Sequence, residues 1–315
     1  EAVAHALRAK LTASEVRLDE PLAPRTTLGV GGKADIAVHL GCVEDLARLL
    51  ATTHEQNLPV RILGRGSNVL VSDLGLRGVT AWLSGPAFAA IDVRDGWVVA
   101  GAGISLPRLL GWTEEQGWSG LEFLEGVPGS LGGALRMNAG AFGSDMGQHV
   151  AWVRRMNPDG TECRIEGDAL GVSYRHGGVL SEGVVFEAGL KLHKTDADTV
   201  RFRRREVARK RAWMKGLRSA GSVFRNPPGD FAGRLIEQAG LKGFRVGGAE
   251  VSPRHANVIA VTGDATASDV RSLMEIMRAR VRFQFGVELT DEIVFLESGW
   301  AKDSQGTGRG SRIDV

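Results

Sequence analysis

The sequence predicts an α+β protein with more than one domain. Its 315 residues suffice for two or three domains, and three regions of different texture follow one another along the chain. Helix and strand patterns alternate in the first region, hairpin signals dominate the second, and helices with short strands make up the third. Forty-three glycines, about twice the usual share, indicate many tight backbone turns.

The first two regions are distinguished by their periodicity. Residues 1–13 predict an amphipathic helix, and leucines at helical spacing predict a second helix over 43–57, before Pro59 introduces the apolar strand "VRIL". In the second region, Asp95-Gly96 separates two β-rich runs, and residues 158–160 separate two more. These are hairpin signals, so we expect antiparallel sheet there.

The third region begins near residue 201 with one basic helix. Two short strands, "FRVGGAEVS" and "ANVIAVTG", precede a long helix whose start near Thr266 offers capping side chains. The strand "EIVFLE" follows this helix. Residues 298–315 are rich in glycine, serine and charge, which predicts a disordered tail or linker.

Composition excludes several classes of protein. Cys42 and Cys163 stand alone and far apart, so neither a disulfide framework nor a metal site is expected. No apolar run of membrane-spanning length and no export leader is present, so we expect a cytoplasmic protein that does not enter a membrane.

A strong positive charge is concentrated in residues 201–218. This segment carries nine lysines and arginines against the single acid Glu206, although the net charge of the whole chain is only +2. It lacks the interleaved aromatic residues typical of nucleic-acid binding, so we favour a solvated helix face and expect no nucleic-acid partner. A phosphate-binding end of this helix stays open as a third interpretation.

A first glycine loop lies in "ILGRGSNVLVSD", residues 62–73. The loop fails the Rossmann pattern, because no third glycine follows at the required place and the next segment is a strand. It still offers a nest of backbone N–H groups suited to phosphate oxygens, although an ordinary turn explains the same residues. The candidate ligand-binding residues here are Gly64, Arg65, Gly66, Ser67 and Asn68.

A second glycine loop is "GVPGSLGGALRMNAGAFG", residues 126–143. Pro128 suits the first turn of a helix, and the glycines allow a ligand to approach the backbone. Tight packing of a helix on a sheet would need the same glycines. Together the two loops suggest a dinucleotide held outside a Rossmann fold, with candidate residues Gly126, Val127, Pro128, Gly129, Ser130, Gly132, Asn138 and Gly140.

Five motifs in order carry a family resemblance. The two loops are followed by "YRHG" (174–177), "AGSVFRNPPGDFAGRLIEQAGLKG" (220–243) and "FGVELTDEIVFL" (285–296). With them, residues 20–297 resemble the UDP-N-acetylenolpyruvoylglucosamine reductases of bacterial peptidoglycan precursor synthesis. Only one tyrosine, Tyr174, is present, and the chain is similar to the shorter branch of the family, which lacks an inserted tyrosine loop.

The resemblance implies an α+β fold with a two-part FAD-binding cradle of the vanillyl-alcohol-oxidase kind and a C-terminal substrate-binding domain. We expect residues 1–78, joined by the strand 289–297, and residues 79–200 to form the two FAD-binding subdomains. Residues 201–288 then form the α+β substrate-binding domain.

The resemblance also implies three catalytic residues, Arg175, Ser222 and Glu292. NADPH is expected to reduce the bound FAD, which passes hydride from N5 to C3 of UDP-N-acetylglucosamine enolpyruvate. Arg175 and a protonated Glu292 are suited to stabilise charge on the substrate carboxylate, and Ser222 to protonate C2, which yields UDP-N-acetylmuramate.

Further substrate contacts are expected around this centre. Arg211 and Lys215 precede the Ser222 loop by few residues and are candidates for the UDP diphosphate, and Tyr174 and Asn226 for other parts of the substrate. Leu217-Arg218 stands where the shorter branch usually has Tyr-Pro, so the resemblance does not indicate which residues hold the uridine end. We expect a monomer.

Two other functions are compatible with parts of this pattern. A vanillyl-alcohol-type oxidase would share the cradle but often binds flavin covalently through histidine or cysteine, and neither loop contains a histidine. A non-catalytic nucleotide-sugar or nucleic-acid binder would not need all three catalytic residues. Ser-His-Asp hydrolysis is disfavoured because no G-x-S-x-G elbow occurs.

Overall fold

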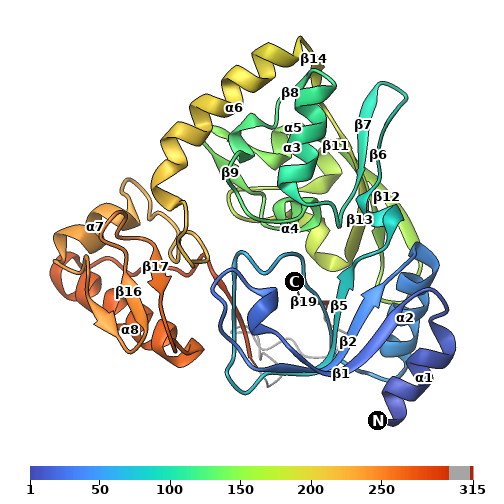
Figure 1. The fold of residues 1–315 in the computed structure, drawn as a ribbon, viewed down its shortest axis with the longest axis horizontal. Coiled ribbons are helices and arrows are strands. Elements are labelled where there is room, and N and C mark those ends of the chain that lie inside the picture. The colour runs from blue at the N-terminus through green and yellow to red at the C-terminus, as the bar shows by residue number, and fades with distance from the viewer. Residues whose placement is uncertain (298–312, 315) are drawn as a thin grey trace.

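The computed structural model describes residues 1–297 and 313–314. Its helices and strands are arranged in three bodies (Figure 1). A sheet from the N-terminal part lies at the lower right in blue, a second sheet lies above it in green, and a smaller orange body lies to the left. The predicted α+β class is confirmed. Among the described residues no helix is long and apolar enough to cross a bilayer.

The first body is a mixed five-stranded sheet of order β1-β2-β5-β3-β19. Strand β2 pairs antiparallel with β1 and parallel with β5. Leucines and valines beneath α1 and α2 form its core, so the predicted alternation of helix and strand is confirmed. Its elements are α1 (Ala2–Lys10), β1 (Glu15–Pro21), η1 (Ala23–Arg25), β2 (Lys33–Leu40), α2 (Val43–Glu55), β3 (Val60–Ile62), β4 (Val69–Val71) and β5 (Leu76–Leu83).

The second body is an antiparallel five-stranded sheet of order β12-β11-β13-β7-β6. Both predicted hairpins are present, since β6 pairs with β7 across Asp95-Gly96 and β11 pairs with β12. Its elements are η2 (Pro86–Ala89), β6 (Ile91–Arg94), β7 (Trp97–Gly101), α3 (Leu106–Glu115), β8 (Trp118–Ser119), η3 (Glu122–Leu124), α4 (Leu131–Arg136), β9 (Gly140–Ala141), β10 (Ser144–Asp145), α5 (Met146–His149), β11 (Val150–Met156), β12 (Glu162–Glu166), η4 (Gly167–Leu170), η5 (Gly178–Glu182), β13 (Val184–Leu190) and β14 (His193–Lys194).

The third body packs two helices on a small antiparallel sheet of order β15-β16-β17. Thr266 and Asp269 form a capping box at the start of α8, where the sequence predicts the cap. The remaining elements of the chain are α6 (Ala197–Arg211), η6 (Ala212–Met214), α7 (Ala232–Gln238), β15 (Arg245–Val246), β16 (Ala249–Val251), β17 (Ile259–Val261), α8 (Ala267–Phe285), β18 (Val294–Leu296) and β19 (Ile313–Asp314).

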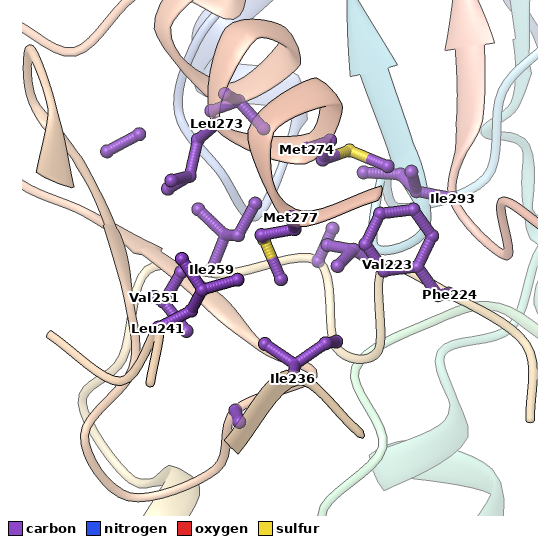
Figure 2. Packing of buried hydrophobic residues seen from close by; sticks show 14 of the residues in the cluster. Val223, Phe224, Ile236, Leu241, Val251, Ile259, Leu273, Met274, Met277 and Ile293 are labelled. Carbon is purple, nitrogen blue, oxygen red and sulfur yellow. The ribbon is translucent and has the colours of Figure 1, made fainter. Parts of the chain in front are cut away.

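The C-terminal core anchors the segment that carries Ser222. Val223 and Phe224 are buried and lie beside Ile293 and the methionines of α8 (Figure 2). Asn257 fixes the same segment from the other side, because its side-chain amide exchanges hydrogen bonds with the N–H and the carbonyl of Phe224, at 3.0 and 2.8 Å. The position of Ser222 is therefore set by the residues that follow it.

The basic helix differs from its prediction in extent and surroundings. It runs over 197–211, and a short 3₁₀ turn follows before Gly216, which has a φ of 80° that interrupts a right-handed helix. Arg201 and Arg204 both pair with Glu114 of α3, at 2.9 and 2.7 Å, so they are not part of the solvated face that the sequence suggests. The helix lies along the second body (Figure 1).

Two polar contacts tie the third body to the first. The carboxylate of Asp73, after β4, accepts hydrogen bonds from the N–H groups of Ala267 and Ser268 at 2.8 and 3.0 Å, and so caps α8 across the interface. Strand β18 pairs in parallel with β4. The last strand of the C-terminal region therefore lies against the first body, as the sequence leads us to expect.

The predicted disordered tail, 298–315, falls largely outside the described residues. Ile313 and Asp314 are described, and they form β19, which pairs in parallel with β3.

Candidate active site

A cavity of about 550 Å³ lies where the two glycine loops meet. Residues from β5, from the segment after η1 and from β13 complete its walls. Five of the residues predicted to bind a cofactor line it: Gly64, Arg65, Pro128, Ser130 and Gly132. Residues of both predicted glycine loops therefore border this cavity.

The two loops lie close together, and the absence of a side chain at Gly64 leaves room for the opposite loop. A Cβ atom on Gly64 would overlap the Oγ atom of Ser130, and one on Gly129 would lie 3.4 Å from Ser67 Oγ. Ser130 is the N-cap of α4, so this helix begins at Leu131, three residues after Pro128. The expected place of Pro128 in the first helical turn is therefore wrong, and a serine hydroxyl makes the cap instead.

The cavity is cationic. Arg25, Arg65 and Arg136 line it, and no acidic residue is among its described lining residues. Trp82 also lines it, and its indole nitrogen is buried without a hydrogen-bond partner in the described part of the chain. Three guanidinium groups and glycine-rich backbone fit a ligand that carries a diphosphate.

Eight predicted cofactor residues do not line this cavity: Gly66, Ser67, Asn68, Gly126, Val127, Gly129, Asn138 and Gly140. Several of them hold neighbouring segments in place. A Cβ on Gly66 would overlap the carbonyl oxygen of Arg25, which explains glycine there without a ligand. The amide of Asn68 donates to the carbonyl of Glu292 at 3.0 Å, and thereby joins the first glycine loop to the segment of that acid.

Asn138 and Gly140 hold the turn that carries Arg175. Asn138 donates to the carbonyl of Ser173 at 2.9 Å, and the carbonyl of Gly140 accepts from the Arg175 guanidinium at 3.2 Å. Asn138 is 4 % exposed. The second glycine loop thus has two roles, since its beginning lines the cavity and its end positions an arginine.

The fold brings Arg175 and Glu292 into contact and places the backbone next to Ser222 beside them, and we call these three residues the Arg175–Glu292 corner. The Nε atom of Arg175 lies 2.6 Å from a carboxylate oxygen of Glu292. The N–H of Glu292 in turn donates to the carbonyl of Val223 at 2.9 Å, and Val223 follows Ser222 directly. Segments separated by more than a hundred residues in sequence therefore meet at one place.

Arg175 has an unusual backbone conformation. It lies in a tight turn in which Ser173 and His176 exchange both backbone hydrogen bonds, and its φ is 55°. Residues other than glycine, asparagine and aspartate rarely adopt this left-handed region, where strain costs about 1–3 kcal/mol. The turn directs the guanidinium toward Gly140 and Glu292. Such strain is common at functional sites.

Burial raises the pKa of Glu292 above that of an ordinary glutamate. Its side chain is 13 % exposed, and the cost of removing the carboxylate from water exceeds the opposing effect of the nearby cations Arg175 and Arg225. The acid is thus more readily protonated than a surface glutamate. This property suits a group that donates a hydrogen bond to a negatively charged ligand.

The four predicted substrate residues differ in their surroundings. Arg211 donates to the carbonyl of Phe123 at 3.5 Å. Its pKa is lowered mainly by burial and also by the positive charge of Arg175, which shows that Arg211 lies close to the corner. Tyr174 is 57 % exposed beside Arg175. Lys215 is exposed.

Asn226 has a local structural contact. Its side-chain oxygen accepts from the N–H of Ala232 at 3.1 Å, at the start of α7. The structure therefore gives this residue a role in fixing the turn after Ser222.

Sequence reasoning missed several residues of the site. Arg25, Trp82 and Arg136 line the cavity but are not among the residues predicted to bind a ligand. The strand pattern around Trp82 indicates only that this residue is buried. Arg225 lies within the motif 220–243 but has no predicted role, although its charge acts on Glu292 and its buried Nε atom has no hydrogen-bond partner among the described residues. No sequence signal distinguishes such side chains from ordinary core and surface residues.

Comparisons with protein families match both halves of this arrangement. Residues 34–166 match a family described as "FAD binding domain", and residues 213–296 match "UDP-N-acetylenolpyruvoylglucosamine reductase, C-terminal domain". Most residues that line the cavity belong to the first matched segment, and Ser222 and Glu292 of the corner belong to the second, whereas Arg175 lies between the two.

Known proteins resemble the chain over most of its length. It is 44% identical over 281 residues to "UDP-N-acetylenolpyruvoylglucosamine reductase 2" of Symbiobacterium thermophilum, covering 88% of this chain and 91% of that protein. The "UDP-N-acetylenolpyruvoylglucosamine reductase" of Heliobacterium modesticaldum is 41% identical and covers 91% and 93%. The crystal structure of a UDP-N-acetylenolpyruvylglucosamine reductase from Thermus caldophilus superposes with a TM-score of 0.77 at 37% identity, over 90% of this chain and 98% of that one.

Proposed function

The chain belongs to the UDP-N-acetylenolpyruvoylglucosamine reductase family of flavin-dependent oxidoreductases, and from this premise we propose which of its residues perform the reduction. The proposed reaction converts UDP-N-acetylglucosamine enolpyruvate into UDP-N-acetylmuramate, with NADPH as the source of electrons. The proposed catalytic residues are Arg175, Ser222 and Glu292.

FAD fits the residues that surround the cavity. Its diphosphate matches the glycine loops and the guanidinium groups of Arg25, Arg65 and Arg136. No histidine or cysteine is among the described lining residues, which favours a non-covalent cofactor over the covalent attachment often found in vanillyl-alcohol-type oxidases. When bound, FAD supplies hydride to C3 of the substrate after NADPH has reduced it.

Arg175 and Glu292 receive the substrate carboxylate. An enol ether is electron-rich, so hydride addition requires that the carboxylate accept the developing negative charge. The Arg175 guanidinium binds a carboxylate through parallel hydrogen bonds, and its contact with Glu292 holds it ready for this. The substrate carboxylate would replace Glu292 as the partner of Arg175, and this exchange favours a proton on the buried acid, which then donates a hydrogen bond.

Ser222 delivers the proton to C2. Its backbone is held by an isolated bridge to Val258 and by the buried pair Val223-Phe224 that follows it, which limits the positions of its hydroxyl. A general acid acts only when it is within hydrogen-bond reach of the reacting atom, so this rigidity supports the assignment. Arg211, close to Arg175, is proposed to bind the substrate diphosphate with Lys215, and Tyr174 and Asn226 to border the same ligand.

The observation that carries the proposal is the 2.6 Å contact between Arg175 and Glu292, one hydrogen bond away from the residue next to Ser222. A non-catalytic binder has no need for a buried acid beside two guanidinium groups at this place. We extend the proposal to a cytoplasmic, monomeric enzyme, since its reductant and its nucleotide-sugar substrate are intracellular metabolites.

Two half-reactions test the proposal. The purified protein should have the absorption spectrum of bound FAD, and anaerobic NADPH should bleach it in the absence of any sugar nucleotide. UDP-N-acetylglucosamine enolpyruvate should then restore the oxidised spectrum in one exponential phase. Bleaching without reoxidation would contradict the proposed substrate, and a protein that neither contains nor takes up FAD would contradict the proposal as a whole.

A further inference from the structure

The backbone segments that carry Ser222 and Glu292 lie side by side on the core of the third body. Phe224 of one segment faces Asp291 of the other in an antiparallel bridge, and backbone hydrogen bonds of 2.8 and 2.9 Å flank this pair. A shift in the register of paired strands moves every side chain that they carry. The pairing therefore sets the place of the Ser222 hydroxyl relative to the Glu292 carboxyl group.

Arg278 of α8 contacts both segments with one guanidinium group. Its Nε atom donates to the carbonyl of Leu289 at 3.2 Å, and its Nη2 atom donates to a carboxylate oxygen of Asp291 at 2.5 Å. Toward the other segment, its guanidinium carbon lies 5.5 Å from the centre of the Phe224 ring. The side chain of Arg278 is 27 % exposed, so water shields these contacts only in part.

This set of contacts requires an arginine. The guanidinium group holds its N–H donors in one plane, so two of them bind a carbonyl and a carboxylate while the face of the group lies against an aromatic ring. Lysine has a single flexible ammonium group and cannot make the same set. Hydrogen bonds to a charged partner are also stronger than neutral ones. Arg278 therefore forms a link that resists sliding of one segment along the other.

The two segments have further side-chain contacts, each of which acts on one of them. Asn257 of the third body fixes the segment of Ser222, and Asn68 of the first body fixes the segment of Glu292. Arg278 differs from both asparagines, because it contacts each segment within two residues of the proposed catalytic side chain.

We propose that Arg278 is a positioning residue for the reduction, which holds the segments of Ser222 and Glu292 in register. It acts through these segments and not on the substrate. The place of the proton donor relative to the acid then depends on Arg278, and a misplacement of about 1 Å at a reacting group can cost about 100-fold in rate. This inference rests on the proposed function, because it requires that Ser222 and Glu292 act on the substrate.

Arg278→Met tests this role in the FAD-loaded enzyme, since methionine keeps an unbranched apolar stem and removes the guanidinium group. The enzyme is reduced with NADPH and mixed with UDP-N-acetylglucosamine enolpyruvate, and flavin absorbance follows a single reoxidation. At saturating substrate the rate constant should fall about 10- to 100-fold, whereas reduction by NADPH stays close to that of the wild type. The substrate concentration that gives half of the maximal rate should change little.

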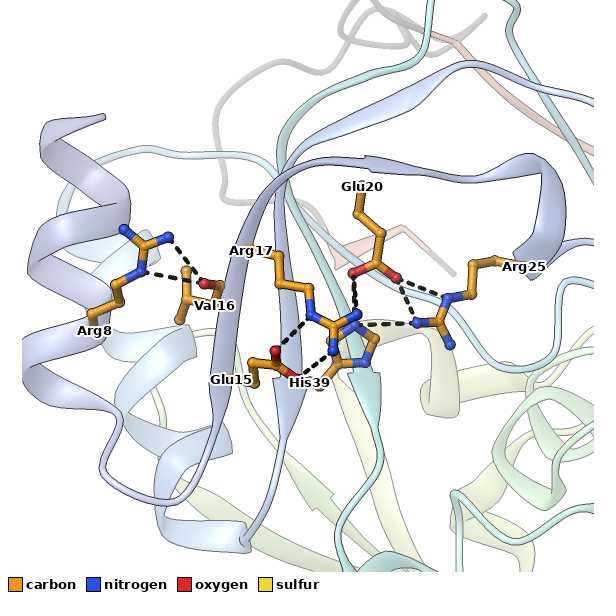
Figure 3. Close-up of polar contacts among 7 residues, drawn as sticks. All are labelled: Arg8, Glu15, Val16, Arg17, Glu20, Arg25 and His39. Carbon is orange, nitrogen blue, oxygen red and sulfur yellow. Dashed lines mark hydrogen bonds and ion pairs between the residues drawn. The ribbon is translucent and has the colours of Figure 1, made fainter.

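The amplitude of reoxidation separates positioning from stability. Unfolded molecules do not react, so a variant that is only less stable loses amplitude and keeps its rate constant. Leu273→Ala is the control for stability, because Leu273 is a buried residue of α8 that lies apart from Phe224 (Figure 2). Arg17→Met is the control for loss of an ion pair, since Arg17 pairs with Glu15 at 2.6 Å in the first body (Figure 3). Both controls should keep the wild-type rate constant.

Two further variants examine the link itself. Asp291→Ala removes the acceptor from the other side, and it provides the same test if Arg278→Met does not fold. It should slow reoxidation less than Arg278→Met, and the double variant should be no slower than Arg278→Met alone. Arg278→Lys keeps the charge but not the planar pair of donors, so its rate constant should stay well below that of the wild type.

A wild-type rate constant in Arg278→Met or, if that variant does not fold, in Asp291→Ala would overturn the inference. An equal fall in Leu273→Ala, or full recovery in Arg278→Lys, would also overturn it. Reduced wild-type enzyme that the substrate does not reoxidise would instead refute the proposed function.

Discussion

The cofactor cavity and the Arg175–Glu292 corner adjoin each other but are built differently. The cavity takes its shape from two stretches of backbone that lie close together, and glycine at 64 leaves room for Ser130 of the other loop. The corner is held by side chains from separated segments, and Asn68, Asn138 and the carbonyl of Gly140 support it. The cavity should therefore be sensitive to added atoms, and the corner to the loss of single functional groups.

The largest effect is expected from Ser222→Ala, which removes one hydroxyl from the corner. NADPH should still reduce the flavin, because Ser222 takes no part in that step. Reoxidation by UDP-N-acetylglucosamine enolpyruvate should slow by about 10²- to 10⁴-fold, the usual contribution of a general acid. Stopped-flow absorbance measures both half-reactions.

Ser219→Ala is the matched control for this variant, since Ser219 is a buried serine three residues earlier in the same loop. It should reoxidise close to the wild-type rate. Equal loss in both half-reactions of Ser222→Ala would contradict the role as proton donor.

Adding one methyl group to the cavity loops should have the next largest effect. In Gly64→Ala the new Cβ overlaps Ser130 Oγ, so the two loops must move apart. Overpacking of this kind costs about 1–3 kcal/mol, and we expect FAD to bind about tenfold more weakly or worse.

The double variant Gly64→Ala, Ser130→Ala provides the rescue, because the Cβ of residue 130 lies at an ordinary 3.6 Å. It should recover most of the FAD affinity, although loss of the N-cap costs about 1 kcal/mol. A double variant that binds FAD as weakly as Gly64→Ala would show that the hydroxyl clash is not the cause.

At neutral pH, a smaller effect on the rate of flavin reoxidation is expected from the protonation state of Glu292. Its raised pKa means that the protonated, donating form persists to higher pH than in an ordinary glutamate, and is lost as the pH rises through that pKa. The rate of reoxidation should therefore fall on the alkaline side, by about tenfold per pH unit beyond the pKa if only the acid form reacts.

Glu292→Gln keeps a hydrogen-bond donor at every pH, so its pH–rate profile should lose this alkaline limb. Stopped-flow reoxidation across a pH series measures both profiles. A wild-type rate that rises with pH would show that the carboxylate, not the acid, is the active form.

The smallest effect concerns stability. Asp73→Ala removes the carboxylate that caps α8 from the first body, and should lower the free energy of unfolding by about 1 kcal/mol. Urea unfolding at fixed FAD concentration measures this loss. Asp264→Ala, an exposed acid just before α8, should have little effect. Equal losses would indicate a general effect of charge rather than a cap.

Local signals predicted much of the fold. The hairpin at Asp95-Gly96 and the cap at Thr266 are present, since turn and capping chemistry acts between neighbouring residues. The basic helix lies further toward the N-terminus than predicted, because it starts at the Asp196 cap and changes to a 3₁₀ turn after Arg211. Pro128 was misplaced because Ser130 caps the helix.

The site was predictable in part. Family motifs named Arg175, Ser222 and Glu292, and the fold brings Arg175 and Glu292 into contact, but nothing local shows that Asn138 supports the turn of Arg175 through Ser173, 35 residues away. Trp82 lies in a strand whose alternation of apolar residues predicts that it is buried, but this pattern does not predict the direction of its indole N–H. Side chains that act through tertiary contacts remain out of reach of sequence patterns.

The left-handed backbone of Arg175 implies a conflict between stability of the fold and activity at this position. Glycine or asparagine would satisfy that conformation with less strain, so the turn itself is better served by residues that cannot bind a carboxylate. Engineering for heat resistance guided by backbone preference alone would select such replacements here, and would remove the guanidinium that we propose receives the substrate carboxylate.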